Sequence, residues 1–287
     1  MNEKTVFTYE NTLGKLVFRY DSPLWITHVE GLSSVEVDIA ESRSTMQIGS
    51  SVNAQSVRPR NFTMDGAIFE PIGSLREKVL DIIAPQTPAT LTVEENGESW
   101  FLNVVPERTP EIMPGRGIQN FQVRLHAAYP YWRTTELYAT QVAGLIKLFK
   151  FPFYTGGKWW ISKYSDSYFQ TLVNEGNVPM DIEVIFSARA AVSHPELYHV
   201  DTRKKIALRK NMVAGEKIIV STVYGSKGVV CISDTGVITN GFRYLSLDSD
   251  LSMALMPGEN ILRMGADYNR EMLGVRIVRS KGVKSGV

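Results

Sequence analysis

Two closely spaced histidines are the residues of this chain with the most obvious potential to bind a metal ion. His194 and His199 supply imidazole nitrogens, a ligand type that zinc accepts. Pro195 lies between them, and no further histidine or cysteine is near in the sequence. Because a zinc site requires three or four protein ligands, the pair is interpreted as two surface or partly packed histidines. The sequence predicts no metal site.

Nucleophilic catalysis has no support in the sequence. Cys231 is the one cysteine, and it lies in an apolar run where a thiol behaves as a small hydrophobic side chain. The G-x-S-x-G motif of serine hydrolases is absent from the sequence. The glycine-rich runs at residues 115–117 and 225–228 do not open a capped helix, so neither predicts a phosphate-binding loop. We therefore expect no catalytic residue, no cofactor and no enzymatic activity.

A basic cluster is the first of two patterns that could bind a ligand. Arginine and lysine side chains gather around a predicted strand, where they could face an acidic partner or a polyanion. A solvated strand face is the more common explanation of such a pattern. The cluster consists of Arg203, Lys204, Lys205, Arg209 and Lys210.

Two adjacent tryptophans form the second pattern. Trp159 and Trp160, with tyrosines nearby in the sequence, could stack on the apolar faces of sugar rings. The same residues could instead pack in a core or at a domain interface, because large aromatic side chains dominate the energetics of both. Packing is the favoured interpretation, and Trp159 and Trp160 remain the candidate glycan-binding residues.

The composition is that of an ordinary soluble protein. The chain has 287 residues, of which 44% are hydrophobic and 21% charged, and this length predicts about two domains. A net charge of +1 argues against a surface built for nucleic acid. The start of the chain lacks the apolar run of a signal peptide, and the longest apolar stretch is broken by Lys147 and Lys150. We expect synthesis in the cytosol and no association with a membrane.

The first third of the chain is rich in predicted strands. Residues 5–9 and 15–20 flank a polar connection that ends in Gly14, a pattern typical of a hairpin. Apolar and acidic residues alternate over positions 35–39 and predict a half-buried strand. Residues 41–57 then break the pattern and predict a long polar connection, of a kind that is usually functional or mobile.

The chain contains one convincing helix. Ser74 and Glu77 form the S-x-x-E pattern of a capping box, in which each side chain satisfies a free backbone N–H at the start of a helix. Leu75, Val79, Ile82 and Ile83 follow as an apolar stripe. Together with the strands around it, this helix makes the first part of the chain an α+β domain.

The stretch of residues 121–133 divides the chain. Phe121, Val123 and Leu125 alternate with polar residues and predict a strand with one apolar face. The strand ends in an aromatic tract whose proline cannot donate a backbone hydrogen bond. We predict a first domain over residues 1–133, with this tract as the structural junction between the domains. The tract consists of Tyr129, Pro130, Tyr131 and Trp132.

The second domain is predicted over residues 134–287, although the linker and first strands in residues 134–175 are not well defined. Short apolar runs recur between glycine, asparagine and aspartate turns, with no capped helix. This regular spacing favours a β-sandwich. The predicted strands cover residues 181–187, 205–208, 217–223, 228–232, 242–247, 260–264 and 273–278.

Six segments, spread over nearly the whole chain, stand out by their order and spacing more than by any one motif. They are residues 58–66 (RPRNFTMDG), 74–83 (SLREKVLDII), 91–93 (LTV), 121–133 (FQVRLHAAYPYWR), 174–179 (NEGNVP) and 255–260 (LMPGEN). In this order and spacing the chain resembles the phage distal tail protein family of long-tailed bacteriophages.

The resemblance implies a structural protein of the virion. Its expected fold is a mostly β chain with one helix, in which a split-barrel-like ring-forming domain precedes a galectin-like β-sandwich that faces outward. Its expected role is that of a distal tail protein, or baseplate hub, at the tail tip, assembled in the cytoplasm of the bacterial host.

The resemblance also implies partners. A homo-oligomeric, six-fold ring would join the tail-tube protein to tail-spike, receptor-binding or other baseplate proteins, with DNA only passing through its channel. The alternative hypothesis is a glycan-binding adsorption protein that uses Trp159 and Trp160. Related contractile particles, such as those of myophages and tailocins, use similar parts, and the sequence does not separate them from a siphophage.

Overall fold

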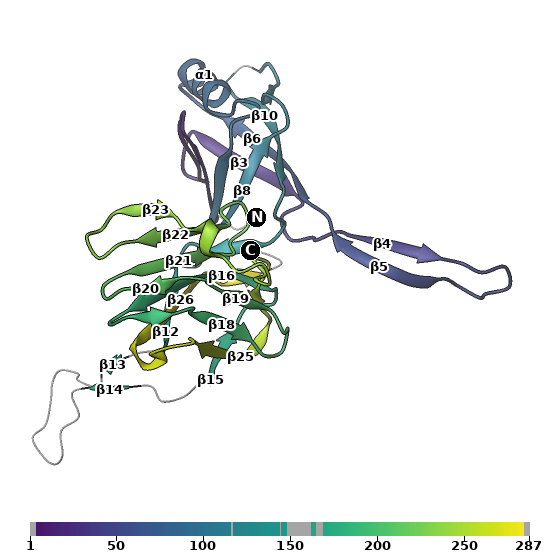
Figure 1. The fold of residues 1–287 in the computed structure, drawn as a ribbon. Helices are drawn as coiled ribbons and strands as arrows, with labels where there is room; N and C mark the ends of the chain where they lie inside the picture. The colour runs from purple at the N-terminus through teal and green to yellow at the C-terminus, as the bar shows by residue number, and fades with distance from the viewer. Residues whose placement is uncertain (1–3, 116, 144, 148–161, 165–168, 284–287) are drawn as a thin grey trace, which may run out of the picture. The chain divides into compact units, whose positions relative to one another are not determined.

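The chain folds into two compact units in a computed structural model, and each unit is described by itself (Figure 1). The structure describes residues 4–115, 117–143, 145–147, 162–164 and 169–283. The first unit comprises Met1–Thr135 and Gly282–Val287, and the second comprises Glu136–Lys281. Whereas the sequence places the boundary after Arg133 and the C-terminus in the second domain, β27 (Gly282–Val283) pairs with β11 (Trp132–Thr134) of the first unit.

An antiparallel sheet of ten strands forms most of the first unit, and seven of its strands follow the order β2-β1-β7-β8-β10-β6-β3. The side chain of Asn11 accepts hydrogen bonds from the backbone N–H groups of Leu13 and Gly14, which closes the predicted first hairpin. Buried residues alternate along β10 as predicted from its sequence. Besides β11 and β27, the strands of this sheet are β1 (Val6–Asn11), β2 (Gly14–Phe18), β3 (Leu24–Glu30), β6 (Arg60–Ile68), β7 (Ala89–Glu95), β8 (Glu98–Pro106), β9 (Glu111–Ile112) and β10 (Gln119–Ala127).

The one α-helix among the described residues, α1 (Ile72–Ile82), has the predicted apolar stripe, with Leu75 partly buried, but not the predicted cap. Val79, Ile82 and Ile83 are buried in the core of the first unit. The helix begins directly after Pro71, so Ser74 lies inside the first turn and makes no side-chain cap, and the predicted capping box is wrong. No helix in the described part of the chain has the length and hydropathy needed to cross a membrane.

Gly66 is required in the middle of β6, where a neighbouring ring occupies the space of a side chain. A methyl group at this position would lie 2.5 Å from the carbonyl oxygen of Trp25 and would collide with the ring of Phe121. We expect Gly66→Ala to lower the free energy of unfolding by about 1–3 kcal/mol, measured by urea denaturation.

The matched control for this substitution is Gly73→Ala on α1. Position 73 has nothing within 4 Å of an added methyl group, and alanine favours a helix over glycine. Gly73→Ala should therefore leave stability unchanged or raise it by up to about 1 kcal/mol. Equal effects of the two substitutions would contradict the packing argument.

Two antiparallel sheets make the second unit a β-sandwich. The larger follows the order β12-β26-β16-β21-β22-β23, and the smaller follows β15-β25-β18-β19. Every second residue of β16 is buried, so one face of this strand packs on the core. The strands are β12 (Tyr138–Ala143), β15 (Phe169–Asn174), β16 (Met180–Ala188), β18 (Glu196–His199), β19 (Lys205–Ala207), β21 (Lys217–Ser221), β22 (Gly228–Ile232), β23 (Ile238–Asn240), β24 (Ala254–Leu255), β25 (Gly258–Gly265) and β26 (Leu273–Arg279).

Short elements complete the second unit. Residues 242–247, predicted to be a strand, instead begin with the 3-10 helix η1 (Phe242–Tyr244). The Asn240 side chain accepts a hydrogen bond from the N–H of Phe242, and this local turn replaces extended pairing. The other short elements are η2 (Arg270–Met272) and the strand pairs β13 (Leu145–Lys147) with β14 (Ser162–Tyr164) and β17 (Val192–Ser193) with β20 (Asn211–Met212).

Candidate functional site

An exposed two-stranded hairpin is the most unusual feature of the first unit. The strands β4 (Val37–Ser42) and β5 (Ser51–Val57) form a sheet of their own, and all of their residues are exposed. In Figure 1 the hairpin extends away from the ten-stranded sheet of its unit. The predicted half-burial of residues 35–39 is therefore wrong for β4, and the predicted irregular connection 41–57 contains a regular strand. Alternation identified the strand but could not show that neither face meets a core.

One face of this hairpin carries its large apolar side chains, with Gln55 and Glu41 among them. Residues that lie opposite each other across an antiparallel pair share a face, and here Val37 lies opposite Val57. Ile39 and Val52 extend the same face, and the four side chains are between 41% and 53% exposed. Two further apolar side chains lie between the strands near the tip and are fully exposed, Met46 and Ile48. An exposed apolar surface of this kind is typical of a protein interaction site.

A buried arginine anchors the root of the hairpin. Arg60 is only 3% exposed, and its Nε donates to the carbonyl oxygen of Pro130 at 2.8 Å. Its Nη1 donates to the carbonyl oxygens of Gly31 and Leu32, in the segment that leads into β4. Burial lowers the pKa of Arg60 to about 10, which is still well above neutral pH, so the guanidinium stays charged. Backbone carbonyl oxygens accept its hydrogen bonds in place of water.

The aromatic tract predicted to join the domains packs on the same segment. Trp132 is fully buried, and its Nε1 donates to the carbonyl oxygen of Leu32 at 3.1 Å. The rings of Tyr129 and Tyr131 meet edge to face with centroids 5.6 Å apart. Pro130 is buried and accepts the bond from Arg60. The predicted interdomain role of the tract stays a prediction, whereas within the first unit it holds the hairpin root.

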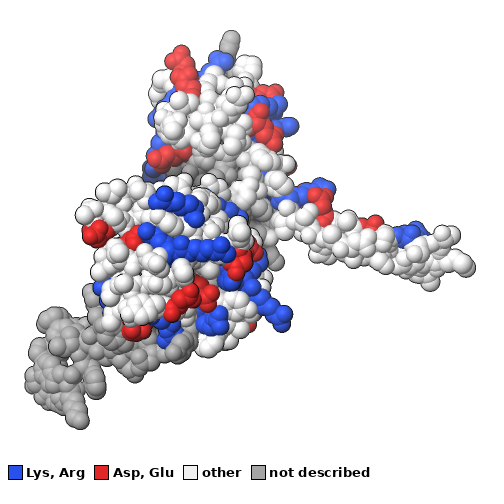
Figure 2. All heavy atoms as spheres, viewed as in Figure 1, with Lys and Arg blue, Asp and Glu red and all other residues white. Residues whose placement is uncertain are grey.

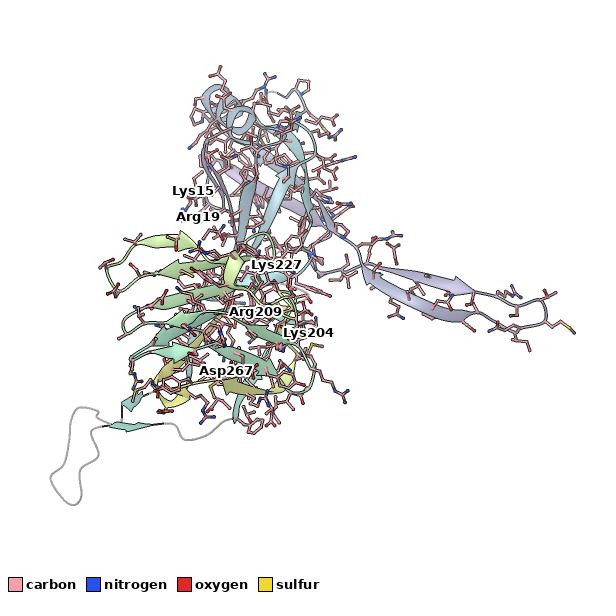
Figure 3. All side chains as sticks on the ribbon, in the orientation of Figure 1. Lys15, Arg19, Lys204, Arg209, Lys227 and Asp267 are labelled. Atoms are coloured by element: carbon pink, nitrogen blue, oxygen red, sulfur yellow. The ribbon has the colours of Figure 1, made fainter. Side chains whose placement is uncertain are left out.

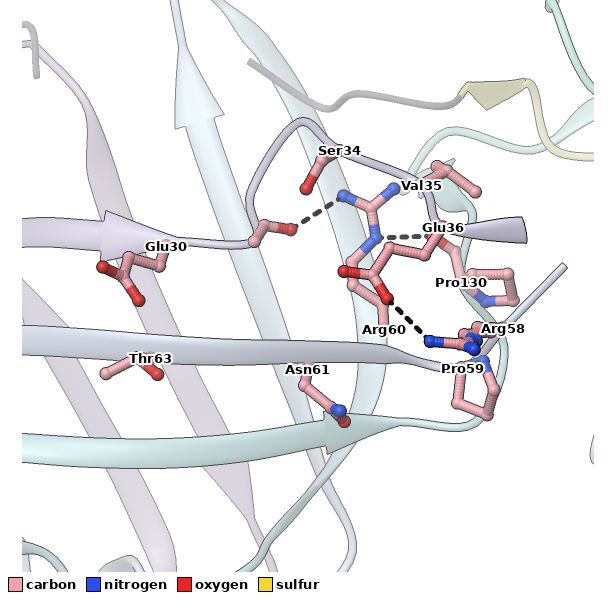
Figure 4. A pocket seen from close by; sticks show the side chains of 11 residues that line it. Glu30, Ser34, Val35, Glu36, Arg58, Pro59, Arg60, Asn61, Thr63 and Pro130 are labelled. Atoms are coloured by element: carbon pink, nitrogen blue, oxygen red, sulfur yellow. Dashed lines mark hydrogen bonds and ion pairs between the residues drawn. The ribbon is translucent and has the colours of Figure 1, made fainter. Parts of the chain in front are cut away.

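A polar pocket of about 310 Å³ lies at this root (Figure 4). Arg58, where β5 ends, pairs with Glu36 and Asp38 across the hairpin, and the hydrogen bond from Arg58 lowers the pKa of Asp38. The N–H of Arg58 donates to the carbonyl oxygen of Glu36 at 2.9 Å. The pocket carries both charge signs, so it offers no strong preference for either kind of ion. Its lining is Glu30, Gly31, Ser34, Val35, Glu36, Arg58, Pro59, Arg60, Asn61, Thr63 and Pro130.

A buried network in the second unit is built around one asparagine. The Nδ1 of His199 accepts a hydrogen bond from the N–H of Thr202, so Nε2 carries the proton and donates to the Oδ1 of Asn260 at 2.9 Å. Asn260 Oδ1 also accepts from the N–H of Met256, and its Nδ2 donates to the carbonyl oxygens of Met256 and Gly258. Both Asn260 and His199 are fully buried, so the prediction of a surface or partly packed histidine is wrong for His199.

A second buried asparagine connects two motifs that are distant in sequence. The Nδ2 of Asn174 donates to the carbonyl oxygens of Val178 and Leu255, at 2.9 and 3.0 Å. Its Oδ1 accepts from the N–H of Gly176. The segments 174–179 and 255–260 are therefore joined in the core. The sequence does not predict this contact, because each segment has the composition of an ordinary turn.

The surroundings of the remaining candidates, one histidine and the cysteine, are those of residues without a catalytic or metal-binding role. His194 is exposed, and its Nδ1 lies 2.7 Å from Asp267. Cys231 is buried as predicted, and burial raises the pKa of its thiol. No group of three or more possible metal ligands occurs among the residues that the structure describes. Trp159 and Trp160 lie outside the described residues, so their predicted glycan-binding role remains a prediction.

Acidic partners neutralise much of the predicted basic cluster. Lys204 lies 3.2 Å from Asp250, and Lys205 pairs with Asp248, whose pKa its hydrogen bond lowers to about 2. Lys210 lies 2.8 Å from the buried Glu216. Arg203 and Arg209 are exposed. The sequence grouped these cations by their positions along the chain, but only folding brings their carboxylates to them.

Comparisons with known proteins agree with both units. Residues 175–273 match the family model of the siphovirus-type tail component, C-terminal domain. The crystal structure of SPP1 Dit, described as a paradigm of the hub adsorption apparatus in phages that infect Gram-positive bacteria, aligns with a TM-score of 0.68. That alignment has 14% sequence identity and covers 96% of this chain and 99% of that chain.

Two further solved structures are similar. Chains from the phage P2 baseplate in its activated conformation, one with Ca and one with Sr, each align with a TM-score of 0.51 and 8% identity, over 96% of this chain and 98% of theirs. No curated protein sequence matches the chain. The predicted fold class, mostly β with one helix and a C-terminal β-sandwich, is confirmed. Residues 175–273 of the second unit thus match the siphovirus-type tail component, C-terminal domain, and the chain as a whole has a fold similar to that of SPP1 Dit.

Proposed function

We propose that this chain is a distal tail protein, a structural component of the baseplate hub at the tail tip of a phage or prophage-like particle. The family match of the second unit and the fold of the whole chain support this role. The role is structural and includes no catalytic step. The protein acts by holding other tail proteins in place.

The exposed hairpin carries the proposal of self-assembly. Its two strands are fully exposed, yet its root is fixed by Arg60 and Trp132. This combination adds little to the stability of a monomer, because an exposed hairpin buries no core and an isolated hairpin is only marginally stable in water. A neighbouring copy that covers the face of Val37, Ile39 and Val52 would explain it. We infer that the first unit forms a closed, six-fold ring through this hairpin.

The ring joins the tail tube to the outer parts of the baseplate. In this proposal one side of the ring contacts the tail-tube protein and the other the tail-spike protein, and DNA passes through the channel. The second unit holds receptor-binding or other baseplate proteins. The near-neutral net charge of +1 limits repulsion between identical copies.

Removing the hairpin is the test of self-assembly. Joining Val37 to Val57 through an Asn-Gly turn deletes residues 38–56 and keeps the root pair, because such a turn connects directly opposite residues. The intact chain is expected to form rings by light scattering and electron microscopy. The shortened chain is expected to stay monomeric, with its stability within about 0.5 kcal/mol of the intact chain, since no core residue is lost.

Two point variants separate the apolar face from the hairpin as a whole. Ile39→Glu places a charge on the apolar face, and Ser56→Glu places the same charge on the opposite face. Only Ile39→Glu should abolish the ring. A strict monomer of the intact chain at high concentration, or equal rings from both variants, would refute assembly through this face.

The alternative function is glycan binding through Trp159 and Trp160. Both tryptophans lie outside the residues that the structure describes, so the geometry adds no support for glycan binding. A glycan array with the intact chain and with Trp159→Ala distinguishes the two functions. A specific signal that the variant loses would establish adsorption to a glycan.

A further inference from the structure

The segment of residues 241–250 closes one edge of the sandwich in the second unit. At its start, the N–H of Gly241 donates to the carbonyl oxygen of Val229 on β22, at 2.8 Å. Further along, the N–H of Ser246 donates to the carbonyl oxygen of Ala207 on β19, at 2.9 Å. The segment is therefore bonded to a strand of each sheet. Side chains that it presents are held on a rigid support, which limits the entropy lost on binding.

Two cations lie against the ring of one tyrosine of this segment, and a third basic residue bonds to the segment's backbone. The Nζ of Lys210 and the guanidinium carbon of Arg243 each lie 4.6 Å from the ring centroid of Tyr244. Arg243 also donates to the hydroxyl of Tyr244 at 2.6 Å. The backbone N–H of Arg209 donates to the carbonyl oxygen of Tyr244, and its Nε donates to the hydroxyl of Ser246. These contacts hold the Arg243 side chain on the ring of Tyr244 and the Arg209 side chain on Ser246, two residues further along the same segment.

The charges of this cluster are not balanced within the unit. Glu216 neutralises Lys210, but neither Arg209 nor Arg243 forms an ion pair with any carboxylate among the described residues. Both arginines are exposed. In Figure 2, blue side chains gather on the second unit over strands β20 to β22, and Figure 3 labels Arg209 in the same region. Two rigidly held guanidinium groups without counter-ions produce a positive potential that attracts carboxylates.

Apolar side chains accompany the arginines. Leu247 is 94% exposed and Phe242 is 46% exposed, and both belong to the same closing segment. Arginine, tyrosine and phenylalanine are enriched at protein interfaces, and arginine and tyrosine among the residues that contribute most to binding energy. A polyanion such as a polysaccharide would use the arginines but would leave a leucine unprotected from water. The composition therefore favours a protein partner.

We propose that this edge, defined by Arg209, Phe242, Arg243, Tyr244 and Leu247, is a docking surface for an acidic segment of another protein. Carboxylates of that segment pair with the two guanidinium groups, and a neighbouring apolar side chain packs on Phe242 and Leu247. The surface lies within the second unit and does not use the hairpin. A chain that forms no rings would therefore still bind the acidic segment. A failure of ring formation can thus be distinguished from a failure of this docking surface.

The test selects binders of the intact chain from a library of short random peptides. The selected peptides are expected to combine aspartate or glutamate with leucine or another apolar residue. Their affinity should fall about tenfold or more in Arg209→Ser/Arg243→Ser and should weaken with salt. The same peptides should bind Lys217→Ser/Arg276→Ser with unchanged affinity, since this control removes two exposed cations elsewhere in the unit. Leu247→Ser should weaken binding without changing the salt dependence.

Three results would overturn the proposal. Selection could yield no acidic peptides, or the acidic peptides could bind the arginine variant as well as the intact chain. Dextran sulfate could bind in an arginine-dependent manner while no acidic peptide does, which would identify a polyanion site instead. None of the substituted side chains is buried, so every variant is expected to fold. A cooperative thermal unfolding transition near that of the intact chain checks this for each variant.

Discussion

Replacing Trp132 with alanine is expected to lower the free energy of unfolding of the first unit by about 3–5 kcal/mol. Trp132 is fully buried and packs edge to face on Phe62 with ring centroids 5.9 Å apart. Removing the indole leaves a cavity and also deprives the carbonyl oxygen of Leu32 of a donor. The loss should therefore reach the hairpin root as well as the core.

Hydrogen exchange measured along the chain can test both parts of this prediction. Trp132→Ala should speed exchange throughout the first unit, and most of all around Leu32. Trp25→Ala is the matched control, because it removes the same atoms from a ring that is only half-buried. It should lower the free energy of unfolding clearly less than Trp132→Ala does. Trp132→Phe retains an aromatic ring but lacks the donor, so it separates packing from the hydrogen bond. Equal costs for the two alanine variants would contradict the anchoring role.

Replacing Asn260 with alanine is expected to lower the free energy of unfolding of the second unit by about 3 kcal/mol or more. The substitution leaves the Nε2–H of His199 and the N–H of Met256 without acceptors in a buried site. Each buried polar group that loses its partner costs about 1–3 kcal/mol. The carbonyl oxygens of Met256 and Gly258 lose a donor as well.

Calorimetry of the intact chain and two variants can test this prediction. Asn260→Asp keeps the acceptor for His199 but places a carboxylate beside two carbonyl oxygens, so it should also destabilise the unit. Asn53→Ala, at an exposed position of the hairpin, should change stability by no more than about 0.5 kcal/mol. An Asn260→Ala variant as stable as Asn53→Ala would show that water or relaxation satisfies the network.

Local patterns determined much of the fold. Alternation placed β10 and β16, and in the apolar stripe of the helix the structure buries Val79, Ile82 and Ile83 and packs the partly buried Leu75 against the same core. Turn residues such as Gly14 separated the strands correctly. These features depend on neighbours in the chain, where the period of side-chain direction shows directly which face is apolar. The two-part, mostly β architecture and the resemblance to tail proteins followed from their order.

Tertiary structure alone decided which of these elements meet a core and which polar residues meet each other. The alternation over residues 35–39 is as regular as that in a buried strand, yet β4, which begins at Val37, pairs with β5 alone among the described strands and has no core to face. Arg60 and His199 resemble surface residues in the sequence, but carbonyl oxygens and an asparagine that are distant in the chain make their burial possible. Burial of a polar group depends on partners that only folding brings within hydrogen-bond distance, and no local pattern encodes them.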